Sequence, residues 1–169
     1  MRKIIFASML FAVGAVILGL NFYENVSAQT SEEKLVADVV RQNAAAFAKN
    51  DLAAMDKIWS NGADVTVFES GYADYGWTDY RDHHLAPEMK EFKNTKYEYT
   101  DIKAKVSGDL AYATMKYTLS ADIDKKPVNS AGLATAILEK QNGSWKIVHW
   151  HSSAPRRTAS PTPTPAKKP

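Results

Sequence analysis

Apolar side chains in the first part of the chain recur every three or four residues, which is the spacing of one face of a helix. They begin after residue 30 and stop near Asn50, so the pattern predicts an amphipathic helix over this stretch. Asp51 is placed to cap a second, shorter helix from Leu52 to about Trp59, because its carboxylate can accept a backbone N–H of the first turn. The apolar positions of the first helix are Leu35, Val36, Val39, Val40, Ala44 and Phe47.

A third helix is predicted further along the chain, beginning at Thr78 or Asp79 after Gly76. Pro87 interrupts this segment. A proline has no backbone N–H to donate, and its ring disfavours the helical conformation at the residue before it. We therefore expect a break or kink at Ala86, with residues 88–92 forming a separate turn.

Alternation of apolar and polar side chains predicts strands on both sides of the third helix. Short extended segments are expected over residues 64–69 and 72–75, and long strands over residues 95–106, 110–123, 128–140 and 145–153. Asn142-Gly143, between the last two, is a strong signal for a two-residue hairpin turn. Helices gathered ahead of an antiparallel meander indicate an α+β domain.

The apolar phase changes within the first long strand. Tyr97 and Tyr99 lie at odd positions, whereas Ile102, Ala104 and Val106 lie at even positions. One extra residue in a strand, a β-bulge, produces such a change and bends the sheet. We therefore expect a cone-shaped, curved antiparallel sheet with three helices over its concave face. Such a cone encloses a cavity, which is the default ligand site.

The last strand, Trp145–Ser153, has apolar side chains at both parities. In a regular strand one face would carry Trp145, Ile147, His149 and His151. The other face would carry Lys146, Val148, Trp150 and Ser152. This strand is expected deep in the sheet, with one face lining the cone and the other able to meet a partner subunit.

The first 28 residues are typical of a secretory signal peptide. They have a basic start at residues 1–3, an uncharged apolar run over residues 4–20, and the small residues Val26-Ser27-Ala28 before a cleavage site. We expect the mature chain to begin near Gln29 and to be secreted or periplasmic. The alternative is an uncleaved anchor, since 17 apolar residues approach the length of a membrane span.

The predicted domain spans residues 29–154 and carries 15 basic and 18 acidic residues. A nucleic-acid-binding protein would need a basic face, so this slightly acidic domain argues against nucleic acid as a partner. Residues 155–169 are rich in Pro, Thr and Lys and are predicted to be a disordered tail. After signal cleavage we expect no contact with a membrane.

The order of the predicted elements and the closing sequence WKIVHWHSS resemble the nuclear transport factor 2-like superfamily, in its SnoaL-like branch. The motif is similar to the last strand of the association (hub) domain of calcium/calmodulin-dependent protein kinase II, which reads Trp-x-Ile-Val-His, an aromatic residue, then His. Gly76 with Asp79-Tyr80 is also similar. The resemblance covers roughly residues 31–154 and implies a cone-shaped fold that forms a homodimer through the open face of its sheet.

This chain departs from the hub domain at one position of that strand. The hub domain has a basic residue directly after its second histidine, whereas this chain has Ser152. Carboxylate binding is therefore not implied here. Relatives include ketosteroid isomerases, polyketide cyclases, dehydratases and non-catalytic modules, so the fold by itself does not decide the function.

Polar and aromatic side chains near the expected cavity are the candidates for a functional site. His84 follows Tyr80 by four residues and shares its helix face, and an imidazole titrates near neutral pH as a general acid or base should. An isomerase-type reaction would need a carboxylate base and a proton-donating tyrosine. The catalytic candidates are His84, Glu69 and Asp64. The ligand-binding candidates are Tyr80, His84, Tyr97, Tyr117, Trp150 and Ser152.

The histidines of the last strand offer a competing interpretation. His149 and His151 would share a face and suit metal ligation if His84, Asp79 or Asp82 supplied a third ligand. The simpler interpretation, supported by the resemblance, is that the pair packs in the sheet or at a dimer face. We predict no metal and no cofactor.

Three functional hypotheses follow from the sequence. The first is a secreted domain that binds a small, partly apolar molecule, neutral or weakly polar, in an aromatic-lined pocket. The second is an isomerase, cyclase or dehydratase that uses His84 or a pocket carboxylate as base. The third is a non-catalytic homo-oligomerisation module.

Overall fold

The computed structural model describes residues 30–155, so the predicted signal peptide and nearly all of the predicted tail lie outside the described residues. A helix over residues 30–48 comes first. It is followed by α2 (Leu52–Ile58), β1 (Thr66–Glu69), β2 (Tyr72–Tyr75), α3 (Trp77–Asp79), η1 (Tyr80–Leu85) and α4 (Ala86–Glu91). Four long strands complete the domain: β3 (Lys93–Ser107), β4 (Leu110–Ile123), β5 (Lys126–Gln141) and β6 (Ser144–Ser153). Within residues 30–155, no helix has the length and apolar character needed to cross a membrane.

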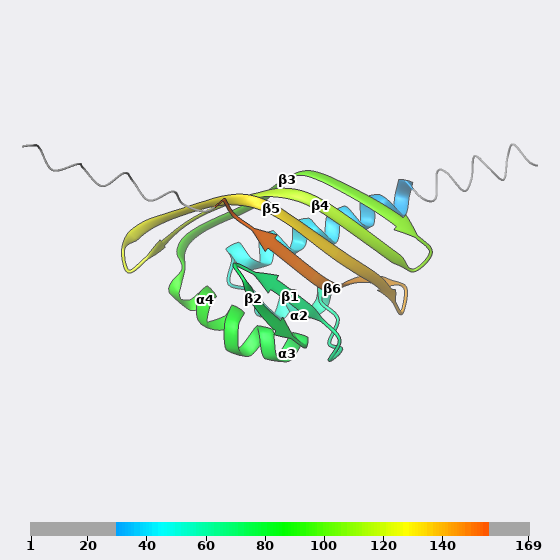
Figure 1. The fold of residues 1–169 in the computed structure, drawn as a ribbon, viewed down its shortest axis with the longest axis horizontal. Coiled ribbons are helices and arrows are strands. Elements are labelled where there is room, and N and C mark those ends of the chain that lie inside the picture. The colour runs from blue at the N-terminus through cyan, green and yellow to red at the C-terminus, as the bar shows by residue number, and fades with distance from the viewer. Residues whose placement is uncertain (1–29, 156–169) are drawn as a thin grey trace, which may run out of the picture.

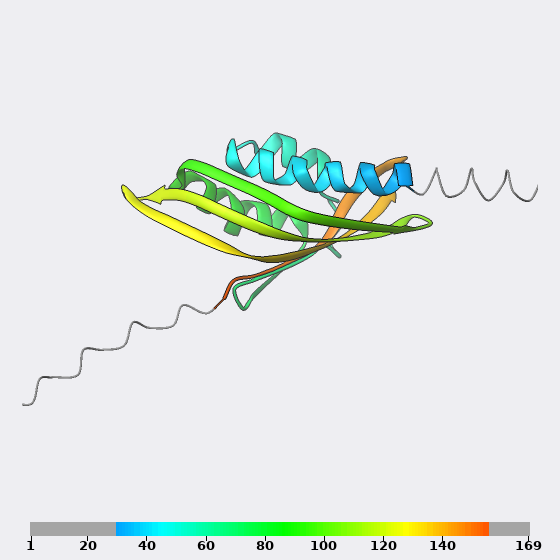
Figure 2. The same ribbon diagram turned by 90° about the horizontal axis from the view of Figure 1, so that it is seen from above.

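All six strands form one sheet, in the order β2-β1-β6-β5-β4-β3. The four long strands pair antiparallel with their neighbours along the chain, whereas β1 pairs in parallel with β6. The sheet is strongly curved, and the helices lie on its concave side (Figures 1 and 2). This arrangement confirms the α+β fold with a cone-shaped sheet that the sequence predicted.

The first two helices meet at the turn that the sequence predicted. Asn50 adopts the left-handed conformation (φ 55°) that often ends a helix. The Asp51 carboxylate then accepts the backbone N–H of Ala54 at 2.9 Å and caps α2. This cap sets where α2 begins and so places its apolar residues, Met55 and Ile58, against the sheet.

The predicted break at Ala86 is wrong. The helix starts at Trp77 and continues through Pro87 to Glu91, with α3, η1 and α4 following one another without a break. The reason is the π-helical turn η1, in which the Ala86 N–H donates to the carbonyl of Arg81, five residues earlier. This wider turn keeps Ala86 helical (φ −66°, ψ −39°) ahead of the proline, whose missing N–H is then no obstacle.

Tight turns and a predicted bulge shape the long strands. Asp124-Lys125 and Asn142-Gly143 both have positive φ at two successive residues, as a type I′ hairpin turn requires. The pairing of β3 with β4 shifts between Thr100 and Lys103, where Asp101 has a φ of 53°. This confirms the β-bulge expected from the change in apolar phase.

A bulge in β6 was not predicted. Ile137 pairs with His149 and Leu138 with Ile147, so Val148 is an extra residue in β6. The regular alternation expected for this strand is therefore wrong. Trp145 and Ile147 face the concave side together with Trp150 and Ser152, and His149 and His151 face away.

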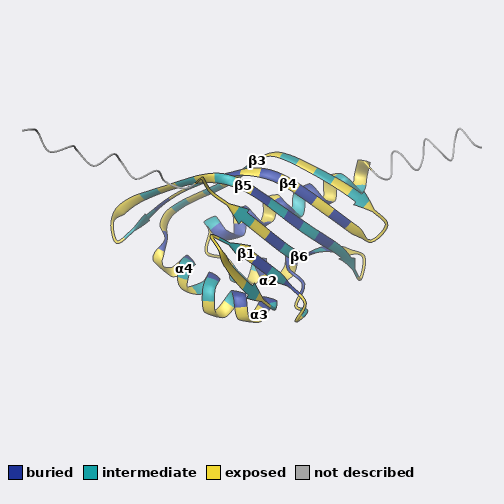
Figure 3. Ribbon diagram, viewed as in Figure 1, coloured by how far each residue is buried: buried dark blue, intermediate teal, exposed yellow. Residues whose placement is uncertain are grey.

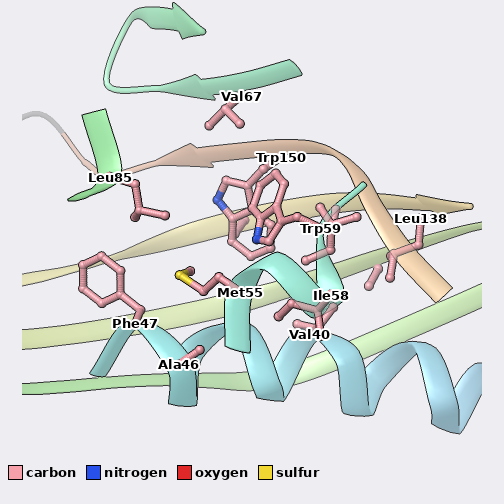
Figure 4. Close-up of a cluster of buried hydrophobic side chains, with 14 of the residues drawn as sticks. Val40, Ala46, Phe47, Met55, Ile58, Trp59, Val67, Leu85, Leu138 and Trp150 are labelled. Atoms are coloured by element: carbon pink, nitrogen blue, oxygen red, sulfur yellow. The ribbon is translucent and has the colours of Figure 1, made fainter. Parts of the chain in front are cut away.

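The core lies between the sheet and the helices. Buried and exposed residues alternate along β4 and along the first part of β6 (Figure 3). Trp59 and Trp150 lie near its centre, with Val40, Ile58 and Leu138 on one side and Phe47, Met55 and Leu85 on the other (Figure 4). The second group borders an open space under the sheet.

Gly132 allows the end of β6 to lie close to this space. It pairs with Tyr117 of β4, and a Cβ atom at this position would overlap the carbonyl oxygen of Ser153. The same Cβ would come within 2.8 Å of the Tyr117 ring. A side chain here would therefore displace both the strand end and a ring that borders the cavity.

Candidate ligand-binding cavity

A cavity of about 380 Å³ lies between the helices and the concave face of the sheet. Its wall is mostly aromatic and aliphatic, and its ionisable acidic and imidazole groups come from β1, η1 and α4. This volume falls in the range of small-molecule sites. The residues around it are Asn43, Phe47, Met55, Trp59, Glu69, Ser70, Tyr72, Tyr80, His84, Leu85, Glu88, Phe92, Tyr97, Tyr99, Tyr117, Leu119, Ile123, Val128, Asn129, Ser130, Trp150 and Ser152.

Glu69, the last residue of β1, is held by two hydroxyl groups. The Tyr80 hydroxyl donates to Glu69 Oε2 at 3.1 Å, and the Ser152 hydroxyl donates to Glu69 Oε1 at 3.1 Å. The pairing of β1 with β6 places Glu69 directly beside Ser152, so the contact follows from the strand register. Both carboxylate oxygens can accept a further hydrogen bond, because each has two lone pairs.

Glu88, on α4, is a second carboxyl group in the same cavity. Burial, together with the negative charge of Glu69, raises the pKa of Glu88 from its ordinary 4.5 to about 6. The nearby His84 opposes this change. Glu88 can therefore gain or lose a proton close to neutral pH, which few carboxyl groups do.

His84 lies at the rim of the cavity and is paired with Asp74 of β2. Its Nδ1 is 2.8 Å from Asp74 Oδ2, and its ring packs edge-on against Tyr80. Burial lowers the pKa of His84, but the hydrogen bond to Asp74 and the charges of Asp74, Glu69 and Glu88 outweigh burial, so the net pKa is raised. A proton on His84 therefore lies beside the carboxylate of Asp74, which is the partner that favours the charged imidazole most.

A chain of hydrogen bonds runs along the wall opposite these acids. Trp59 Nε1 donates to Asn43 Oδ1 at 2.8 Å, and Asn43 Nδ2 donates to the Tyr99 hydroxyl at 3.3 Å. Tyr97 is also hydrogen-bonded to Tyr99, and burial raises the pKa of both tyrosines far above the ordinary value of 10. Both hydroxyls therefore keep their protons and can act as hydrogen-bond donors.

The histidines of the last strand lie outside the cavity. His149 Nδ1 is 2.7 Å from the Thr66 hydroxyl, and its ring packs edge-on against Phe68 on the outer side of the sheet. Burial lowers the pKa of His149, and the neighbouring His151 lowers it further. Within residues 30–155, no group of three or more His, Asp or Glu side chains is arranged to hold a metal ion.

Comparisons with known proteins agree with this geometry. A family model described as "SnoaL-like domain" matches residues 36–157. The chain belongs to the SnoaL-like domain family. A search of curated proteins finds no match.

Solved structures share the fold of this SnoaL-like domain. One is a nuclear transport factor 2-like superfamily protein from Salmonella enterica serovar Typhimurium, with a TM-score of 0.71 and 16% identity, covering 77% of this chain and 95% of that one. A candidate ketosteroid isomerase from Shewanella frigidimarina has a TM-score of 0.61 and 28% identity, covering 69% and 92%. A candidate dehydratase from Streptomyces avermitilis has a TM-score of 0.67 and 18% identity, covering 74% and 96%.

Most of the residues singled out from the sequence of this SnoaL-like domain come together at its cavity. Seven of them line it: Glu69, Tyr80, His84, Tyr97, Tyr117, Trp150 and Ser152. Asp64 does not; it is exposed and lies before β1, beside Gly62. The sequence analysis missed Glu88 and the pairing of His84 with Asp74, because the expected break at Ala86 removed Glu88 from the third helix.

Proposed function

We propose that this SnoaL-like domain binds a small, partly apolar molecule in the cavity under its sheet. The observation that carries the proposal is the cavity itself, an open space of about 380 Å³ with a mainly aromatic wall and a few polar groups gathered from separate elements. Proteins pack their cores tightly and leave few voids larger than a water molecule. A void of this size, ringed by partly buried charges, is more typical of a ligand site than of a packing defect.

Filling the cavity tests this proposal. The position chosen for the larger side chain is Leu119 of β4, which belongs to the cavity wall and is only partly buried. Ala113 of the same strand is less suitable, because it is fully buried and points into the core. We expect Leu119→Trp to keep the protein folded and to remove the thermal shift that small aromatic and alicyclic compounds produce in the parent. The matched control is Leu35→Trp, because Leu35 is 49% exposed and does not line the cavity. Equal thermal shifts in the Leu119→Trp variant and the parent would contradict a ligand site here.

Acid–base catalysis is the second candidate function, because a carboxyl group of pKa about 6 shares the cavity with proton-donating tyrosines. In this mechanism Glu88 removes a proton from the carbon next to a carbonyl group, and the C–H electron pair moves to form an enolate. The Tyr99 hydroxyl donates a hydrogen bond to the enolate oxygen. Glu88 then returns the proton to a carbon of the same molecule, so the net change is an isomerisation or an exchange.

The rate of hydrogen exchange next to a carbonyl group directly measures acid–base catalysis by Glu88. We expect the domain to accelerate exchange of the α-hydrogens of 1-tetralone in D₂O, followed by NMR. The rate should rise with pH through about 6, as Glu88 ionises. Glu88→Gln should remove the acceleration, whereas Glu91→Gln, at an exposed position of α4, should retain it. An exchange rate equal to that in buffer would count against catalysis of this type.

We also propose that the protein is exported from the cytoplasm and forms a homodimer. The predicted signal peptide supports secretion or export to the periplasm, with the cleavage site near Ala28 and Gln29.

A homodimer is supported by large apolar side chains exposed on the strands: Phe68, Leu110, Tyr112 and Leu133. Light scattering that gave a monomer mass for the mature chain would contradict the dimer, and with it the third hypothesis of a homo-oligomerisation module.

A further inference from the structure

The charged side chains that line the cavity are mainly acidic. Among the described residues that line it, the carboxyl groups Glu69 and Glu88 are the acidic ones, His84 is the one imidazole, and there is no Lys or Arg. The imidazole of His84 is already paired with Asp74, whose Oδ2 lies 2.8 Å from its Nδ1. The two glutamates therefore share one partly buried space in which, among the described lining residues, there is no Lys or Arg and His84 is the one group that can carry a positive charge.

Two negative charges in one cavity repel each other. Part of the reason that Glu88 keeps its proton to a higher pH is the charge of Glu69. Glu69 itself accepts hydrogen bonds from the hydroxyls of Tyr80 and Ser152, which supply no positive charge. The unbalanced charge lies where a ligand would reach it, and it favours a ligand that brings a cation.

The wall of the cavity suits the same kind of ligand. The rings of Tyr97, Tyr99 and Trp150 pack against one another along one side, with ring centroids 4.9 and 5.5 Å apart. The faces of aromatic rings attract cations, and this attraction strengthens when water is excluded. An anionic ligand would meet repulsion from both glutamates, and a neutral one would leave their repulsion in place.

We infer that the ligand of this cavity carries a protonated amine, which lies between the carboxylates of Glu69 and Glu88 while its apolar part rests against the aromatic wall. This inference rests on the proposed binding function and narrows the class of ligand. It differs from the neutral or weakly polar molecule expected from the sequence, because Glu88 was then placed outside the third helix. The ammonium group would donate hydrogen bonds to both carboxylates, and hydrogen bonds between charged groups are the strong ones.

Matched probes that differ in charge test the inference. Each set has three compounds with the same apolar group: a cation, a neutral alcohol and an anion. For the phenyl group these are 2-phenylethylammonium, 2-phenylethanol and 3-phenylpropanoate, and the corresponding naphthyl and cyclohexyl compounds form two further sets. Binding to the parent protein would be measured by calorimetry and thermal shift at pH 7.5 and low salt. We expect the ammonium member of at least one set to bind about tenfold or more tightly than its alcohol, and the carboxylate to bind least.

Variants then connect this preference to the two carboxylates. Glu88→Gln and Glu69→Gln should each reduce the preference for ammonium over alcohol to about threefold or less, while Glu91→Gln leaves it unchanged. Glu91 is exposed on the same helix as Glu88 and does not line the cavity, so it controls for a general loss of negative charge.

The pH dependence gives a second measurement. Below about pH 6 Glu88 holds a proton, so ammonium binding should weaken as the pH falls through this value. The charged groups that act on the pKa of Glu88 are Glu69, His84 and Glu91, and Asp74 acts in turn on His84. The Glu88→Gln variant should therefore show a flatter pH profile than the parent over the same range.

The outcomes separate the inference from the proposal beneath it. If the alcohol or the carboxylate of every set binds as tightly as the ammonium compound, the inference is wrong and the binding function stands. The same holds if Glu88→Gln and Glu69→Gln keep the full preference. If no member of any set binds at millimolar concentration, the proposed binding function fails as well.

Discussion

Replacing Trp59 with alanine is expected to lower the free energy of unfolding by about 3–5 kcal/mol, the range for removing a large aromatic side chain from a core. Trp59 is 3% exposed and stacks on Trp77 with ring centroids 4.8 Å apart. Its backbone also pairs with Ile147, which joins the end of α2 to β6. The side chain thus contacts the third helix, the last strand and the cavity wall together, and no single neighbour can fill its place.

Urea unfolding followed by circular dichroism measures this effect. The matched control is Tyr75→Ala, since Tyr75 is 64% exposed and its removal should cost about 0.5 kcal/mol or less. A loss below about 1 kcal/mol for Trp59→Ala would show that the aromatic cluster is not a main source of stability.

The milder change Trp59→Phe separates packing from hydrogen bonding. It keeps a ring beside Trp77 but removes the N–H that donates to Asn43 Oδ1 at 2.8 Å. Asn43 is 4% exposed, so water cannot easily replace the lost donor. We expect a cost of about 1–3 kcal/mol for the unsatisfied oxygen together with the smaller ring. Tyr99, which Asn43 also contacts, should then show altered aromatic signals by NMR.

Replacing Glu88 with glutamine is expected to stabilise the domain above pH 6, by about 1–2 kcal/mol at pH 7.5. In the folded protein the pKa of Glu88 is raised from 4.5 to about 6, so folding disfavours the ionised side chain by about 2 kcal/mol. Between these two pH values the folded protein binds more protons than the unfolded chain, and stability falls as the pH rises. Glutamine is neutral throughout and lacks this loss.

The pH dependence distinguishes this explanation from a general effect of the substitution. Below pH 4.5 Glu88 is protonated in both states, so the variant and the parent should have nearly equal unfolding free energies. The gap should open between pH 4.5 and 6 and stay constant above it. Glu91→Gln, at the exposed position three residues away, should show no such opening. A Glu88→Gln variant less stable than the parent at pH 7.5 would mean that the carboxylate makes a favourable contact that outweighs its burial.

The fold was predictable because its signals are local. The phase change from Tyr97 to Ile102 and the Asn142-Gly143 turn each depend on a few neighbouring residues, and both were confirmed. The helix cap at Asp51 is of the same kind. These local features agree with one another, and together they specify the curved sheet and the helices over it.

The cavity was predictable only in part, because its polar groups meet through pairings between distant segments. Glu69 reaches Ser152 through the parallel pairing of β1 with β6, which no local pattern encodes. Glu88 was missed for a different reason. A proline usually ends or kinks a helix at the residue before it. Here the π-helical turn before Pro87 keeps Ala86 helical, so the helix continues through the proline. That turn keeps Glu88 on the helix that borders the cavity.

The extra residue in β6 divides one strand into two parts with separate tasks. Before Val148, Trp145 and Ile147 pack in the core, and Trp145 also holds Glu32 of the first helix at 2.7 Å. After it, Trp150 and Ser152 face the cavity. If Val148 were accommodated in a regular ladder, Trp145 and Ile147 would face the opposite side of the sheet from Trp150 and Ser152, and one of the two pairs would leave the concave face. The bulge thus changes the phase of the strand once, so that two pairs of side chains at opposite parities in the sequence share the concave face of the sheet.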